Sequence, residues 1–132
     1  MRSNESIERC IAKYAEAAPE VDYEVLEDGM WVIHDEYDNV ENIVVHHDPP
    51  LLVFRVKLME CPEKNREELF RRMLELNATE IPHGAFGLEN ENVVLIDTLQ
   101  SENLDQNELA ASIDSLILTI GAYHQELRRL RA

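Results

Sequence analysis

The residues best suited to chemistry stand together in one segment, His46-His47-Asp48, directly before Pro49-Pro50. Imidazole and carboxylate groups are common zinc ligands, and His34 could join this segment across a pair of strands. Neighbouring side chains on a strand point to opposite faces, however, so His46 and His47 could share an ion only if a turn began there. We therefore favour surface or turn histidines; the alternative is a metal-dependent enzyme that uses His34, His46, His47 or Asp48.

A second polar segment, Pro82-His83-Gly84, lies between a predicted helix and a predicted strand. A general base needs a partner and a pocket, and no nucleophile stands beside His83 in the sequence. The sequence also has no Gly-rich phosphate loop, no G-x-S-x-G elbow and no H-E-x-x-H helix. We predict no catalytic residue, no metal site and no cofactor, and we interpret the segment as the connection between helix and strand.

The charge of the chain restricts its partners. The 132 residues include 27 acidic and 12 basic side chains, which gives a formal net charge of −15. Between Lys13 and Arg55 there is no Lys or Arg, whereas eleven acidic residues occur there. Such a region repels phosphate backbones and anionic membrane surfaces, so we predict neither a nucleic-acid nor a membrane partner.

The apolar segments are too short for a membrane span, and the N-terminus lacks the apolar core of a signal peptide. We therefore expect a cytoplasmic protein. Cys10 and Cys61 fit no metal or redox spacing, and in that compartment packed, reduced thiols are the favoured interpretation.

Hydrophobic periodicity predicts three helices, which begin near Asn4, Asn65 and Asp105. These three residues are the predicted N-caps, and the last two have a Glu three residues later, as in a capping box. Asn77 is predicted to close the second helix in the left-handed conformation. Strands are predicted over residues 21–26, 30–36, 42–47, 51–59, 85–89 and 92–99, with a polar loop up to residue 41 and turns at Asp28-Gly29, Pro49-Pro50 and Asn90-Glu91.

Sequential strands with short turns favour an antiparallel sheet, and strands grouped between helices indicate the α+β class. Because residues 21–26 are the weakest of the predicted strands, the first group has three or four. We predict a single domain over residues 1–132, with an antiparallel sheet of about five strands packed by three helices in the order α-βββ-α-ββ-α.

Two candidate contact surfaces follow from apolar patterning. In the strand 51–59, one face carries Leu52, Phe54, Val56 and Leu58, which the helices should cover. The other face carries Leu51 and Val53, which we predict to bind protein, with Trp31 as a third candidate, although Trp31 packed on a helix is favoured. The apolar residues of the second helix are more than one core-facing stripe needs, and Phe70 and Met73 are the predicted contacts of a homodimer.

The sequence from Leu51 to Leu127 resembles the YbjN-like family, which shares the fold of the type III secretion chaperones, the Tir-chaperone group. The matching features are Pro62 after a strand, the helix that ends at Leu76-Asn77, the segment Gly84-Ala85-Phe86-Gly87-Leu88, the polar hairpin, Leu99 leading to Asn103-Leu104, and Tyr123 near the end. The first helix and the Asp28-Gly29 turn fit more loosely. The resemblance implies an α+β fold, a homodimer and no catalytic centre, in a protein that holds an extended segment of a client polypeptide.

Three hypotheses of function remain at this point. The first is a non-catalytic chaperone-like or adaptor protein that binds another polypeptide. The second is a regulatory or small-ligand-binding domain in a bacterial stress response, which a polar pocket between the long helix and the sheet would favour. The third is the metal-dependent enzyme, which elemental analysis would detect.

Overall fold

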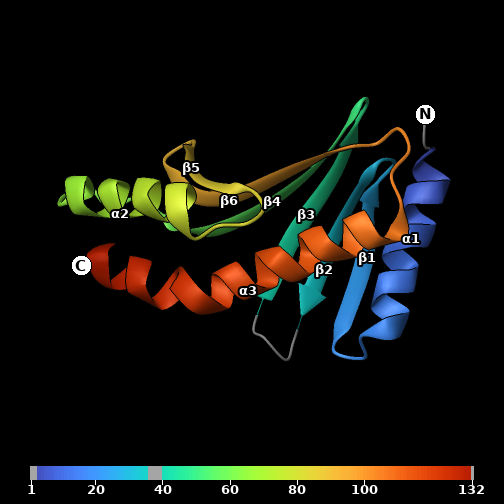
Figure 1. The fold of residues 1–132 in the computed structure, drawn as a ribbon, viewed down its shortest axis with the longest axis horizontal. Coiled ribbons are helices and arrows are strands. Elements are labelled where there is room, and N and C mark those ends of the chain that lie inside the picture. The colour runs from blue at the N-terminus through green and yellow to red at the C-terminus, as the bar shows by residue number, and fades with distance from the viewer. Residues whose placement is uncertain (1–2, 36–39, 132) are drawn as a thin grey trace.

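The computed structural model describes residues 3–35 and 40–131, which form three helices and a six-stranded sheet (Figure 1). The helices are α1 (Asn4–Ala17), α2 (Arg66–Thr79) and α3 (Gln106–Arg131). The strands are β1 (Val21–Glu27), β2 (Met30–Asp35), β3 (Val40–Asp48), β4 (Leu51–Glu60), β5 (Ala85–Glu89) and β6 (Asn92–Gln100). The predicted polar loop up to residue 41 lies mostly outside the described residues.

All strand pairs are antiparallel, in the spatial order β1-β2-β3-β4-β6-β5. The predicted α+β class and the alternation of helices with strand groups are therefore confirmed. The first group has four strands, because Val21–Glu27 pairs with β2 along most of its length. The turns are also as predicted: Gly29 has a φ of 81°, and Asn90 and Glu91 have φ values of 50° and 64°.

The core lies between one face of the sheet and the helices. The predicted covered residues of β4, Leu52, Phe54, Val56 and Leu58, are all buried in it. The long helix α3 passes α1 at one end of the molecule and runs beside α2 at the other (Figure 1). It contributes the following buried apolar residues: Leu109, Ile113, Leu116, Ile117, Ile120 and Leu127.

Only one of the three predicted N-caps has the predicted geometry. At α3, the Glu108 backbone N–H donates to Asp105 Oδ1 at 2.8 Å and the Asp105 N–H donates to Glu108 Oε1 at 3.3 Å, which confirms the capping box. At α1 the cap is Ser3, whose Oγ accepts from the Ser6 N–H at 3.2 Å. Asn65 precedes α2 in the left-handed conformation and makes no side-chain cap bond.

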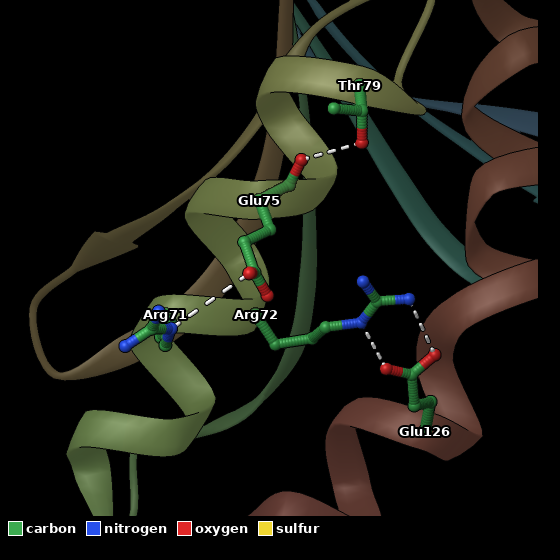
Figure 2. A network of polar contacts seen from close by, with 5 residues as sticks. All are labelled: Arg71, Arg72, Glu75, Thr79 and Glu126. Carbon is green, nitrogen blue, oxygen red and sulfur yellow. Dashed lines mark hydrogen bonds and ion pairs between the residues drawn. The ribbon is translucent and has the colours of Figure 1, made fainter.

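The predicted end of α2 at Asn77 was wrong. The helix continues to Thr79, whose hydroxyl donates to the Glu75 carbonyl at 2.9 Å (Figure 2), and Asn77 itself is helical. The Asn77 side chain bonds to strand β5: its Oδ1 accepts from the Phe86 N–H at 2.8 Å and its Nδ2 donates to the Phe86 carbonyl at 3.0 Å. Asn77 is therefore a joint between helix and sheet.

Charged side chains also connect α2 to α3. Arg72 makes a two-bond contact with Glu126, with Nη2 at 3.4 Å from Oε1 and Nε bonded to Oε2 (Figure 2). The hydrogen bond to Glu126 raises the pKa of Arg72 above its usual value. Because both side chains are more than a third exposed, this pair contributes orientation more than stability.

Candidate protein-binding surfaces

One face of the sheet is turned away from the helices, and we call it the open face. Strand alternation and register assign to it the following residues: Met30, Val32, His34, Val44, His46, Leu51, Val53, Arg55, Lys57, Val94, Ile96 and Thr98. Val32 and Val94 are buried, whereas the others are half-buried or exposed. The open face is thus the part of the sheet on which a partner has access to apolar side chains.

The predicted residues Leu51 and Val53 lie on the open face, in β4. Val53 stands opposite His46 of β3 and Thr98 of β6, and it is half-buried. Leu51, at the start of the strand, has 39% of its surface exposed. Toward the other end of β4, Arg55 pairs with Glu89 of β5 at 3.2 Å. The open face therefore has an accessible apolar part at the start of β4 and a charged part further along the strand.

Trp31 does not share this surface. It lies on the covered face, 1% exposed, and its Nε1 donates to Glu8 Oε1 of α1 at 3.2 Å. Ile33, on the same face of β2, is buried as well. Packing against a helix, the interpretation favoured from the sequence, is therefore correct for Trp31, and the side chain is not available to a partner in this conformation.

The helix α2 carries both residues predicted for a dimer contact, but only one of them reaches its outer surface. Phe70 is half-buried, but Met73 is only 4% exposed and packs in the core of the chain. The neighbouring Leu74, which the sequence prediction did not include, is 68% exposed. Accessible apolar surface on this helix therefore comes from Phe70 and Leu74.

The histidines of the segment 46–48 point to opposite faces, as predicted. His46 is on the open face, and His47 is buried on the covered face. His47 Nδ1 lies 2.6 Å from Asn4 Oδ1, and Asn4 Nδ2 donates to Asp28 at 2.9 Å, so His47 Nδ1 carries the proton and donates. Burial, followed by the charge of His46, lowers the pKa of His47. These bonds fasten the start of α1 to the sheet.

The described residues contain no group of three or more His, Cys, Asp or Glu side chains that could hold a metal ion. His34 is on the open face with His46, but it is four residues along β2 from Met30, the residue opposite His46. His83 is exposed in the connection before β5. Cys10 is buried, Cys61 is half-buried, and both are free thiols.

The sequence did not predict a groove of about 850 Å³ between α1 and α3. Small residues form much of its lining: Ala17, Ala18, Ala110, Gly121 and Ala122. The Tyr14 hydroxyl donates to Asp114 Oδ1 across the groove at 2.6 Å. Burial, followed by this hydrogen bond, raises the pKa of Tyr14 far above its usual value, so the hydroxyl stays protonated. Leu118 on its rim is 73% exposed.

The fold is that of the type III secretion chaperones. The chain is similar to a chain of the ExoU–SpcU complex from the type III secretion system of Pseudomonas aeruginosa, with a TM-score of 0.59, 14% identity, and 93% of this chain and 95% of that chain covered. It is also similar to a chain in the structure of the Yersinia pestis type III secretion chaperone SycH with a fragment of YscM2, with a TM-score of 0.56, 14% identity, and coverage of 84% and 93%. A third similar structure is YbjN from E. coli, with a TM-score of 0.59, 10% identity, and coverage of 87% and 90%.

The family model CesT_Tir_1 matches residues 4–132, so the chain belongs to this family of type III secretion chaperones. The resemblance inferred from the sequence, including the one to YbjN, is thereby confirmed. No curated protein matches the sequence. Among the helices that the structure describes, none combines the length and the apolar content of a membrane span.

Proposed function

We propose that this chain is a non-catalytic, chaperone-like or adaptor protein that binds another polypeptide in the cytoplasm, acting as one domain over residues 1–132. The family match over residues 4–132 is the observation that carries the proposal. Two of the similar structures support it, because one is a heterodimeric complex of the type III secretion system and the other is a type III secretion chaperone in complex with a fragment of a second protein. A net charge of −15 favours clients with basic flanks over other acidic molecules.

We place the client on the open face, around Leu51 and Val53. Apolar side chains that stay accessible on a folded chain mark contact sites, and extended segments can lie over such a face or add to a sheet edge. Met30, Val44 and Ile96 lie on the same face and extend this apolar surface. Trp31 is left out because it is buried against α1.

The double variant Leu51→Asp with Val53→Asp should fold and lose its partner. Two added carboxylates would be desolvated by a docked apolar segment, so we expect partner recovery to fall about tenfold or more. The measurement is photo-crosslinking in the native lysate, followed by quantitative mass spectrometry, with circular dichroism as the test of folding. The matched control is Val25→Asp with Leu88→Asp, two exposed residues that stand opposite the covered residues Trp31 and Val93 and so lie outside the open face; this variant should keep the partner.

Three results would count against these statements. If the wild-type chain captures no protein even after crosslinking, the partner-binding proposal fails. If the Leu51/Val53 variant is unfolded, those residues belong to the core. If it folds and recovers the partner as well as the control does, the client docks elsewhere.

We further propose a homodimer that forms through the outer surface of α2, with Phe70 and Leu74 in contact. Sedimentation velocity at micromolar concentration should show a species of about twice the 15.3 kDa of the chain. Leu74→Asp should shift it toward the monomer, because the exposed Leu74 side chain would be buried in the contact. A monomer of the wild-type chain throughout this range contradicts the proposal.

A further inference from the structure

The groove between α1 and α3 is built from segments far apart in the sequence. Lys13, Tyr14, Ala17 and Ala18 line it from α1, and α3 lines it from Gln106 to Ala122. Its volume of about 850 Å³ is in the range of sites that hold drug-sized molecules or several peptide side chains. The small side chains on both helices let another backbone approach closely.

Two residues of α3 in this groove have no explanation within the chain. Gly121 lies inside a long helix, where glycine is about 1 kcal/mol less favourable than alanine. A Cβ added at Gly121 would meet nothing within 4 Å, so packing does not require glycine there. Three residues earlier, Leu118 exposes 73% of its surface, the largest value among the exposed large hydrophobic side chains of the described chain. Both features suit an outside chain that lies along α3.

The charges of the groove restrict that outside chain. Glu20 and Asp114 line it and are exposed, and Asp35 lines it while buried, whereas Lys13 is the only cation among the lining residues that the structure describes. The Tyr14 hydroxyl donates to Asp114, so this carboxylate is held at the groove. A second copy of the chain would bring the same carboxylates against these, so charge disfavours self-association through this face.

We propose that the groove between α1 and α3 binds a short apolar segment of a partner polypeptide that carries Lys or Arg beside its apolar residues. The apolar side chains lie along Leu118, Gly121 and Ala122, and the cations face Glu20 and Asp114. This inference rests on the proposed partner-binding function, and it adds a second contact surface and the chemistry of the segment that it recognises.

The test uses a fluorescein-labelled amphipathic peptide of Leu, Ala and Lys, and a matched peptide in which Glu replaces Lys. In fluorescence anisotropy at physiological salt, the full chain should bind the Lys peptide and not the Glu peptide. Gly121→Leu fills the groove, so it should weaken binding of the Lys peptide about tenfold or more. The control Ala111→Leu adds the same side chain at an exposed position of α3 outside the groove and should change nothing.

A chain this acidic could attract any basic peptide, so the groove variants are needed to distinguish specific from non-specific binding. If Gly121→Leu and Ala111→Leu bind the Lys peptide alike, the attraction is non-specific and the proposal is wrong. Leu118→Lys is a second variant, which cannot disturb the core because that side chain is so exposed, and it should weaken binding similarly. If Leu118→Asp converts a dimer to a monomer in sedimentation, the groove is a self-association surface and the proposal is overturned.

The results also separate this site from the proposed function. Leu51→Asp with Val53→Asp changes the open face only, so it should leave binding of the Lys peptide intact. If the groove variants bind the Lys peptide as well as the wild-type chain does, while the chain still captures a partner through the open face, only the groove proposal is wrong. If the wild-type chain binds the peptide through the groove but captures no protein, only the proposed function is wrong.

Discussion

Replacing Asn77 with leucine is expected to lower the free energy of unfolding by about 2–3 kcal/mol. The Asn77 side chain acts as a partner strand for Phe86, since it accepts from the Phe86 N–H and donates to the Phe86 carbonyl. Leucine has neither group, so it leaves two part-buried backbone groups of β5 without these bonds, at about 1 kcal/mol or more each. Urea unfolding monitored by circular dichroism gives the difference directly.

The control for this prediction is Ala78→Leu, which introduces the same side chain at the adjacent, exposed position of α2 and should change stability little. Hydrogen exchange gives a local reading. The Phe86 amide should lose protection in Asn77→Leu and keep it in Ala78→Leu. If Asn77→Leu unfolds at the same urea concentration as the wild-type chain, the side chain does not hold β5 in place.

The wrong prediction at Asn77 shows that local sequence does not reveal a hydrogen bond to a residue in another element. An asparagine near the end of a helical pattern is typical of the left-handed closing residue, and nothing nearby distinguishes that role from a long-range one. The competing bond comes from Phe86, nine residues later, whose position depends on how β5 joins the sheet. The box of Asp105 and Glu108 was predictable because both partners lie in one helical turn.

The candidate surfaces also divide into those that local sequence predicts and those that it does not. Alternation in β4 was enough to place Leu51 and Val53 opposite the covered side chains, because one strand carries both faces. The face of Trp31 depends on pairing between strands, which its own segment does not reveal. The groove joins Tyr14 to Asp114, 100 residues apart, so no local pattern encodes it. Its one sequence signal was that Leu118 and Gly121 lie outside the apolar stripe of α3.

The segment 77–88 therefore has a structural role. It holds α2 in place on the sheet, and the proposed dimer contact lies on the outer surface of α2. Asn77 attaches α2 to β5 from the helix side, and Gly84 leads the chain into β5 close to β6. His83 lies exposed between them. Any change that loosens this joint should disturb α2, which carries the proposed dimer contact, before it reaches the open face around Leu51.

Gly84→Ala is expected to destabilise the chain by about 3 kcal/mol, although it adds a single methyl group. Gly84 has a φ of 81°, a conformation that an L side chain rarely adopts. The added Cβ would also lie 2.5 Å from the Ile96 carbonyl oxygen and 3.2 Å from Asp97 Cβ. A backbone oxygen in the centre of β6 cannot rotate away, so the entry to β5 must move.

The same chain offers the matched control, Gly87→Ala, three residues further along. No positive φ occurs at Gly87, and a Cβ there would meet nothing within 4 Å. Alanine restricts the unfolded chain more than glycine does, so this variant should be neutral or slightly stabilised. Thermal and urea unfolding of the two variants should separate them clearly. If Gly84→Ala and Gly87→Ala have equal stability, β5 does not approach β6 as closely as the structure shows, and the explanation of the Gly84 position fails.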